Sequence, residues 1–376
     1  MKVDIILKTI IFLITLKIAS PFGVFFLTFF LPITLSVIAI FIFKYKLHTV
    51  GFVFSGVIPS SLVLLSWLLI FYNTKFPIEL YAHYFYITSI VSIITFSFVI
   101  NSFSSILYKS AFWQDLTKNL IVFHGVILLT QIVLYHLLGI TLDLGELTGG
   151  NEIRSIYFFN GQEIFRASGL YEEPSIFSAY MFSYIVVRYI FNANSVDRYI
   201  VFGTSCMLMT WSTLAVILVI IFYIISSIRF NIYSFIIALA TVAIIGGFSL
   251  DFIISRYENT ISGLDPSNLT KIKVITDFIN DRDLIIYGYG LIRKNMFYGL
   301  DGLGDTTVYT SLITIFGIFI GGIITILILL GIVFSELKIR EKVLISSVFI
   351  KFAWPGYMIF WFFVVYSISF GRRSKK

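Results

Sequence analysis

The sequence predicts an all-α protein that crosses a membrane many times, built as one integral membrane domain over residues 1–376. The chain is 58% hydrophobic and only 12% charged, with a mean hydropathy of +0.96. A soluble domain is about 25% charged. Apolar runs of about 20 residues recur along the chain, as a bilayer about 30 Å thick requires. The apolar residues do not alternate with period two, which argues against a β-barrel.

The apolar runs predict eleven or twelve membrane spans. Polar residues 210–213 divide the run from 198 to 228, which favours a tight hairpin there. Lys351 and Trp354-Pro355 interrupt the last run, so it forms either one crossing or two short re-entrant segments. The predicted spans are residues 4–19, 22–43, 50–72, 82–107, 119–140, 174–193, 198–212, 213–228, 231–250, 308–334 and 343–370.

Basic residues orient these spans, because short cytoplasmic loops of membrane proteins are rich in lysine and arginine. With the spans above, the basic residues of five loops fall on one side, and we expect a cytoplasmic N-terminus there. We attribute the net charge of +7 to this orientation and to contact with lipid headgroups. The lysines and arginines do not form one basic face, so no nucleic-acid partner is predicted. The basic loop residues are Lys44, Lys46, Lys109, Lys118, Arg188, Arg198, Arg229, Lys338, Arg340 and Lys342.

Two long polar segments, 141–173 and 251–307, then lie on the extracytoplasmic side. Loops longer than about 15 residues usually carry a function or are disordered. In the second segment, Asp265-Pro266 is a helix start, and Tyr287-Gly-Tyr-Gly290 is a turn of permissive backbone. The helix between them is predicted to be amphipathic, with apolar residues at helical spacing: Leu269, Ile272, Ile275, Phe278 and Ile279.

Arginine and carboxylate side chains gather in these two segments. A planar guanidinium binds phosphate oxygens through paired hydrogen bonds, and a carboxylate can accept the proton of a hydroxyl nucleophile. Together they predict transfer chemistry on a lipid-linked diphosphate; the plainer alternative is that these charges are simply solvated. Cys206 is the only cysteine and the four histidines are scattered, so no metal site is predicted. The charged residues are Arg154, Arg166, Arg256, Arg282, Arg293, Lys294, Glu172, Glu173, Asp301 and Asp305.

One arrangement in the first segment is more specific than composition. Arg166, Gly169, Glu173, Pro174 and Ser175 form the pattern Arg-x-x-Gly-x-x-x-Glu-Pro-Ser. This pattern resembles that of bacterial O-antigen and capsular polysaccharide polymerases and, more distantly, that of O-antigen ligases. The resemblance covers roughly residues 119–335. Later features follow in the order typical of the family: the hairpin at Trp211-Ser-Thr213, Arg256, the amphipathic helix, Gly288-x-Gly290, Asp305 and the glycine-rich helix from Phe316 to Gly322.

The resemblance implies a glycosyltransferase of the GT-C type in the bacterial inner or plasma membrane, with its active site on the extracytoplasmic face. Such a polymerase transfers a growing glycan from undecaprenyl diphosphate to a sugar hydroxyl of the next lipid-linked repeat unit. Undecaprenyl-diphosphate-linked oligosaccharide is then both donor and acceptor, and no metal or other cofactor is implied. Membrane lipid, a flippase and a chain-length regulator are the other expected partners.

The resemblance assigns Arg166 and Arg256 to the diphosphate, with Arg293 as a third candidate. Glu173 would orient or deprotonate the acceptor hydroxyl; its plainer alternative is a first-turn carboxylate favoured by the helix dipole. Asp305 is the second catalytic candidate, near the position at which the ligases carry a histidine. Structural roles are expected for Gly169, Pro174, Ser175, Gly288 and Gly290.

Two other functions stay open. An O-antigen ligase is disfavoured because the chain has no histidine after His136. A polysaccharide flippase or other transporter predicts inverted repeats and charged or broken helices near the bilayer midplane. We find no clear repeat, and the charges collect in segments 141–173 and 251–307.

Overall fold

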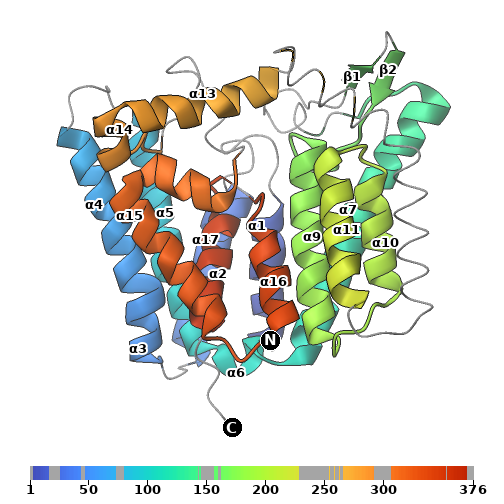
Figure 1. The fold of residues 1–376 in the computed structure, drawn as a ribbon. Helices are drawn as coiled ribbons and strands as arrows, with labels where there is room; N and C mark the ends of the chain where they lie inside the picture. Colours follow the sequence, from blue (N-terminus) through green and yellow to red (C-terminus); the bar gives the residue numbers. More distant parts are fainter. Residues whose placement is uncertain are drawn as a thin grey trace.

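The computed structural model shows long helices that lie side by side, with α13 lying across one end of them (Figure 1). It describes residues 3–16, 26–43, 47–72, 80–142, 144, 156–159, 162–227, 254, 258, 262, 266–291, 306–352 and 354–370. The predicted span at 231–250 and three candidate site residues, Arg256, Arg293 and Asp305, lie outside the described residues.

The described elements are helices and one small hairpin of strands. Strand β1 (Ile156–Phe159) pairs with strand β2 (Gln162–Phe165) in antiparallel register. Two π-helical segments, η1 (Phe26–Phe30) and η2 (Val53–Val57), continue directly into α2 and α4. The α-helices are α1 (Val3–Thr15), α2 (Leu31–Phe43), α3 (Thr49–Phe52), α4 (Ile58–Tyr72), α5 (Leu80–Ser102), α6 (Ser104–Leu107), α7 (Ser110–Leu138), α9 (Pro174–Phe191), α10 (Arg198–Leu208), α11 (Thr213–Ser227), α13 (Pro266–Asn280), α14 (Arg282–Tyr287), α15 (Val308–Val333), α16 (Ile339–Val348) and α17 (Met358–Phe370).

Five of the described helices are long and apolar enough to cross a membrane: the continuous helix over Thr49–Phe71, α5, α7, α9 and α15. Large apolar side chains also lie on the surface, where Phe41 is 75% exposed and Phe319 is 66% exposed. Exposed apolar side chains of this size suit contact with lipid better than contact with water. The chain is therefore a helical, membrane-embedded protein, and the count of eleven or twelve spans stays a prediction.

Two helix boundaries bear on the sequence predictions. The hairpin expected at 210–213 is present, because α10 ends at Leu208 and α11 begins at Thr213. Helix α7 differs from its predicted span, since it begins at Ser110 and takes in Lys118. The Lys118 ammonium lies 5.6 Å from the centre of the Tyr199 ring. A lysine near a helix end can extend its charge to the interface, so it need not end the helix.

Helix α15 is broken at Gly317, whose φ of 78° and ψ of 164° are not helical. Such a break leaves carbonyl groups of the preceding turn without helical amide partners. Two amides of the 288–290 segment supply them, donating to the carbonyls of Thr314 and Ile315 at 2.8 Å each. Both glycines of this segment have positive φ, 75° and 77°, which side-chain-bearing residues rarely adopt. The turn after α14 thereby completes the broken turn of α15.

The last apolar run contains two helices, α16 and α17, separated at 349–357 around Lys351 and Trp354-Pro355. They have 10 and 13 residues. At about 1.5 Å per residue, each is shorter than the hydrocarbon core of a bilayer. Helix α16 packs on α9 and α11, and α17 packs on α5 and α15. We call this element the C-terminal hairpin.

Helix α13 and the strand pair lie at the same end of the bundle, which we call the α13 end (Figure 1). The helix begins at Pro266, the first helical position that the sequence predicts. Val274 and Phe278 face the protein, at 1% and 7% exposed, whereas Ile272 and Ile279 are 53% and 62% exposed. Val274, which the predicted apolar set omitted, is thus the most buried of these residues, and isoleucines lie on the outward side of α13, as on a helix at a membrane surface.

Candidate active site

The charged segment that the sequence singles out lies at the α13 end, between β2 and α9. Helix α9 begins at Pro174, a favourable first residue because the amide at that position needs no helical partner. Glu173 precedes it with extended backbone, φ −139° and ψ 147°, and its side chain makes no hydrogen bond to the helix amides. The Glu173 carboxylate therefore does not act as a capping acceptor, and its described partners lie elsewhere.

Gln131 of α7 holds the turn that precedes Glu173. Its Oε1 accepts the amide of Gly169 at 2.7 Å, and its Nε2 donates to the carbonyl of the same residue at 3.0 Å. Gly169 has a φ of +62°, and a Cβ there would lie 3.0 Å from the ring of Phe177. The glycine permits the turn, and the glutamine satisfies its buried backbone groups.

Gln131→Leu is expected to lower the thermal stability, because it leaves the amide and carbonyl of Gly169 buried without these partners, at a cost of about 1–3 kcal/mol for each group. Thermal unfolding of the detergent-solubilised protein measures the effect. Thr130→Val is the matched control, since the Thr130 hydroxyl donates to the Val126 carbonyl of its own helix. Equal unfolding temperatures for Gln131→Leu and Thr130→Val would contradict this assignment.

Tyr171 anchors the same segment to α1, α7 and α9. Its hydroxyl donates to the carbonyl of Thr15 at 3.2 Å and lies 3.3 Å from the hydroxyl of Tyr184. Its ring stacks on His124 of α7, with 5.5 Å between centroids. Burial, with smaller contributions from neighbouring tyrosines, raises the pKa of the Tyr171 phenol well above its ordinary value, so the hydroxyl stays protonated and keeps donating.

Glu173 meets two polar side chains, one from its own helix and one from the C-terminal hairpin. Ser175 Oγ donates to Glu173 Oε2 at 2.9 Å. Lys351 Nζ lies 3.9 Å from the same oxygen and donates to Ser175 Oγ at 3.2 Å. We call these three residues the Glu173 triad. At this separation, opposite charges attract by about 4 kcal/mol at an effective dielectric constant of about 20, before desolvation is counted.

Lys351 is the site residue that the sequence interpretation missed. It is only 8% exposed. The available signal was a lysine inside an apolar run, which is costly unless it has a partner or a role. Its position is fixed through its neighbours: the carbonyl of Phe349 accepts the amide of Val308 at 3.0 Å, which ties the hairpin to the first residue of α15.

Glu172, which the sequence motif leaves out, is also engaged. It is partly buried, and Tyr357 donates to its Oε1 at 3.3 Å. The break in the C-terminal hairpin thus supplies a partner to each of the two adjacent carboxylates: Lys351 to Glu173 and Tyr357 to Glu172. The two partners come from residues that are not helical, between α16 and α17.

Arg166 adds a second buried cation to this end of the bundle. It follows β2 directly and is 9% exposed. The Glu173 carboxylate is suited to accepting a hydroxyl proton, and the guanidinium of Arg166 is a group suited to neutralising a phosphate. Within the described ranges, no group of three or more histidine, cysteine, aspartate and glutamate side chains is placed to hold a metal ion.

The sequence-predicted candidates are brought together only in part. Arg166, Gly169, Glu173, Pro174 and Ser175 form the segment described above, and Ser175 contacts the Glu173 carboxylate. Gly288 and Gly290 join α14 to the broken turn of α15 and are structural in the contacts described. Arg256, Arg293 and Asp305 lie outside the described residues, so their positions relative to Glu173 stay predictions.

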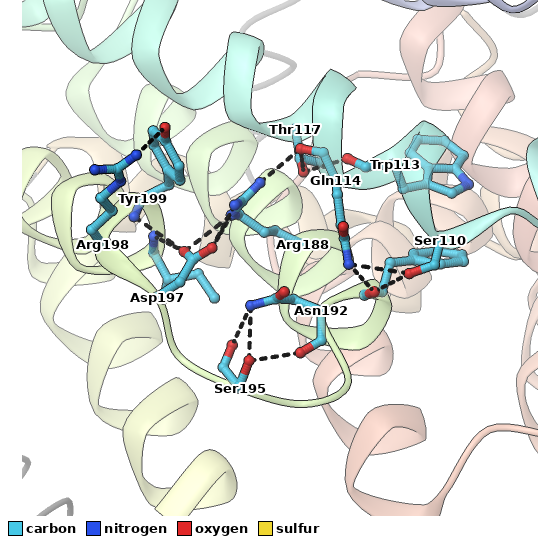
Figure 2. A network of polar contacts seen from close by, with 12 residues as sticks. Ser110, Trp113, Gln114, Thr117, Arg188, Asn192, Ser195, Asp197, Arg198 and Tyr199 are labelled. Atoms are coloured by element: carbon cyan, nitrogen blue, oxygen red, sulfur yellow. Dashed lines mark hydrogen bonds and ion pairs between the residues drawn. The ribbon is translucent and has the colours of Figure 1, made fainter.

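A second polar network lies at the opposite end of α9, where Arg188 meets Asp197 (Figure 2). Arg188 Nε donates to Asp197 Oδ1 at 3.0 Å and to Oδ2 at 2.8 Å, and Nη1 donates to the carbonyl of Gln114 at 2.7 Å. Asp197 also caps α10, accepting the amides of Tyr199 and Ile200 at 3.1 Å. The network ties α7, α9 and α10 together.

The same end of α9 holds several of the basic residues from which the orientation of the spans in the membrane was predicted. Asn194 donates to Glu341 Oε1 at 2.7 Å, so the start of α16 lies beside the loop that follows α9. Gln114 brings the start of α7 to the same place. The basic segments around Lys118, Arg188 and Lys338 therefore gather at the end of α9 that is farthest from Glu173.

Comparison with known proteins gives no family for the chain. No protein-family model, no curated protein and no solved structure matches it.

Proposed function

We propose that this protein is a metal-independent glycosyltransferase of the GT-C type that polymerises a polysaccharide. It transfers the growing glycan from undecaprenyl diphosphate to a sugar hydroxyl of the next lipid-linked repeat unit. The observation that carries the proposal is the Glu173 triad, a carboxylate held by Ser175 and Lys351 at the end of an apolar helix, in the segment that begins with the buried Arg166.

The proposed chemistry uses the charged residues in two roles. As the oxygen of the acceptor hydroxyl bonds to the anomeric carbon of the donor glycan, the Glu173 carboxylate accepts the proton of that hydroxyl. The bond from that carbon to the phosphate oxygen breaks, and the lipid diphosphate leaves with its electron pair. Arg166, with Arg256 and Arg293, binds the diphosphate, since positive side chains can stabilise the leaving charge. Asp305 is the second candidate for the proton-accepting role.

The proposed setting is the inner or plasma membrane of a bacterium, with the N-terminus in the cytoplasm and the α13 end outside. The clustering of basic segments at the opposite end of α9 supports this orientation, because basic residues collect on the cytoplasmic side. A lipid-linked diphosphate then reaches Glu173 from the outer leaflet, delivered by a flippase. A chain-length regulator is the other proposed partner.

Complementation of a strain that lacks its own polymerase tests the function. Wild type is expected to restore a ladder of glycan lengths on a gel, whereas Arg166→Ala and Glu173→Gln leave single repeat units. The matched controls are Arg198→Ala, at the first residue of α10, and Glu336→Gln, between α15 and α16; both side chains are exposed, and both variants are expected to keep the ladder. Membrane levels of every variant are compared by immunoblot.

Full ladders from both Arg166→Ala and Glu173→Gln would refute the site assignment. Accumulation of repeat units on the cytoplasmic face of cells that lack the protein would refute polymerisation itself and identify a flippase, the alternative from the transporter class.

A further inference from the structure

We propose that Lys351 is a positioning residue for Glu173, which makes the C-terminal hairpin a working part of the active site. This inference rests on the proposed function, because it gives Lys351 a role in the same reaction. A lysine buried in an apolar hairpin carries a large desolvation cost, and such residues usually have a charged partner and a function. The charged partner here is Glu173, whose Oε2 lies 3.9 Å from Nζ.

The hairpin holds Lys351 in one place. The next residue, Phe352, stacks on Tyr180 of α9, with 5.0 Å between centroids and 23° between ring planes. A few residues on, the carbonyl of Pro355 accepts the Trp361 indole at 2.7 Å. Because both packing and hydrogen bonds fix the break, the ammonium is presented to the first turn of α9 by a rigid support rather than by a long free side chain.

Two contacts of Lys351 converge on a single oxygen of Glu173. Nζ attracts Oε2 directly, and it also donates to Ser175 Oγ, which in turn donates to Oε2. The carboxylate is thus oriented from one side by a charge and by a hydroxyl that the same charge holds. An ammonium has three donors, so Lys351 can serve both contacts at once.

The test uses the full-length protein purified in detergent, with lipid-linked repeat units extracted from cells that lack it as donor and acceptor. Lys351→Met is expected to lower kcat by about 10- to 100-fold, the scale of a displaced catalytic group, and to leave KM within about twofold. Lys351→Arg restores the charge and is expected to recover most of kcat. Lys342→Met is the matched control, because its ammonium donates to the Val333 carbonyl at the other end of α16.

Several outcomes would overturn the inference. A wild-type kcat in Lys351→Met would overturn it. A rise in KM with kcat unchanged would also overturn it, because Lys351 would then be a substrate-binding residue. Equal losses in Lys351→Arg and Lys351→Met would indicate a structural role. If Lys351→Met gives no monodisperse protein, Ser175→Ala decides, since it removes the hydroxyl between Nζ and Oε2; wild-type kcat in that variant would then refute the role.

Glu173→Gln separates this inference from the function on which it rests. If Glu173→Gln is inactive while Lys351→Met keeps its wild-type kcat, only the positioning role of Lys351 is lost. If Glu173→Gln itself turns over at the wild-type rate, the assignment of the site in the proposed function fails.

Discussion

Gly288→Ala and Gly317→Ala are each expected to destabilise the protein by more than about 4 kcal/mol, beyond the usual range for one substitution. Both residues have backbone that only glycine adopts readily, with φ 75°, ψ 179° and φ 78°, ψ 164°. A Cβ on Gly288 would come within 3.0 Å of the Ile315 carbonyl oxygen, and one on Gly317 within 3.0 Å of the Ile286 carbonyl oxygen. The obstacles are backbone atoms, so no rotation of a side chain relieves them.

Two glycines serve as controls for this prediction. Gly322 lies on α15, has no positive φ, and has nothing within 4 Å of an added Cβ, so Gly322→Ala is expected to unfold at the wild-type temperature or above. Gly139 has a φ of +67° and equally open space, so Gly139→Ala isolates the cost of conformation, about 1–2 kcal/mol. Thermal unfolding in detergent, followed by tryptophan fluorescence, ranks the four variants. Wild-type stability of Gly317→Ala would contradict the break in α15.

Asp197→Asn is expected to destabilise the protein by about 3 kcal/mol, because it leaves a buried guanidinium without its carboxylate. The side chain of Arg188 is 7% exposed and that of Asp197 is 24% exposed. Asparagine can still accept the amides at the start of α10, so the substitution removes the charge and keeps the cap. In an Arg188→Met background, Asp197→Asn is expected to cost little stability, and the difference between the two backgrounds measures the coupling of Arg188 with Asp197. Strictly additive losses of stability would refute this coupling.

The same pair makes stability depend on pH. Burial raises the pKa of the Asp197 carboxyl, but hydrogen bonds from the Arg188 guanidinium and from two backbone amides outweigh this effect. The pKa of Asp197 therefore lies below its ordinary value of 3.8. A carboxyl whose pKa is lower in the folded state stabilises that state above the unfolded pKa and loses this contribution as the pH falls through the folded pKa. The difference in unfolding temperature between wild type and Asp197→Asn is therefore expected to be constant above pH 3.8 and to narrow below it.

Local signals predicted several elements correctly. Pro174 and Pro266 are the first residues of α9 and α13, because a proline that cannot continue a helix can begin one. The polar residues at 210–213 separate α10 from α11. The strand pair was missed although its signal was present: Asn160-Gly161 joins the two runs, and this dipeptide is the strongest short-range signal for a hairpin.

Only the part of the candidate site that lies in the 166–175 segment was predictable from the sequence. Arg166, Glu173 and Ser175 are close in sequence, so a sequence motif is enough to group them. Lys351, which contacts Glu173 and Ser175, could be noticed as an anomaly in an apolar run but not paired with them, since Nζ and the Ser175 hydroxyl belong to residues 176 positions apart. No periodicity or spacing rule reaches across that separation.

By itself, the sequence determined that this protein is helical and embedded in a membrane, because apolar composition and run length are properties of short segments. Only the tertiary structure decided which charges meet. The contact of Lys351 with Glu173, the pairing of Arg188 with Asp197, and the closure of the α15 break by the 288–290 segment all depend on how distant helices pack. Packing is a property of the whole chain, so the partners of buried charges appear only once the helices are assembled.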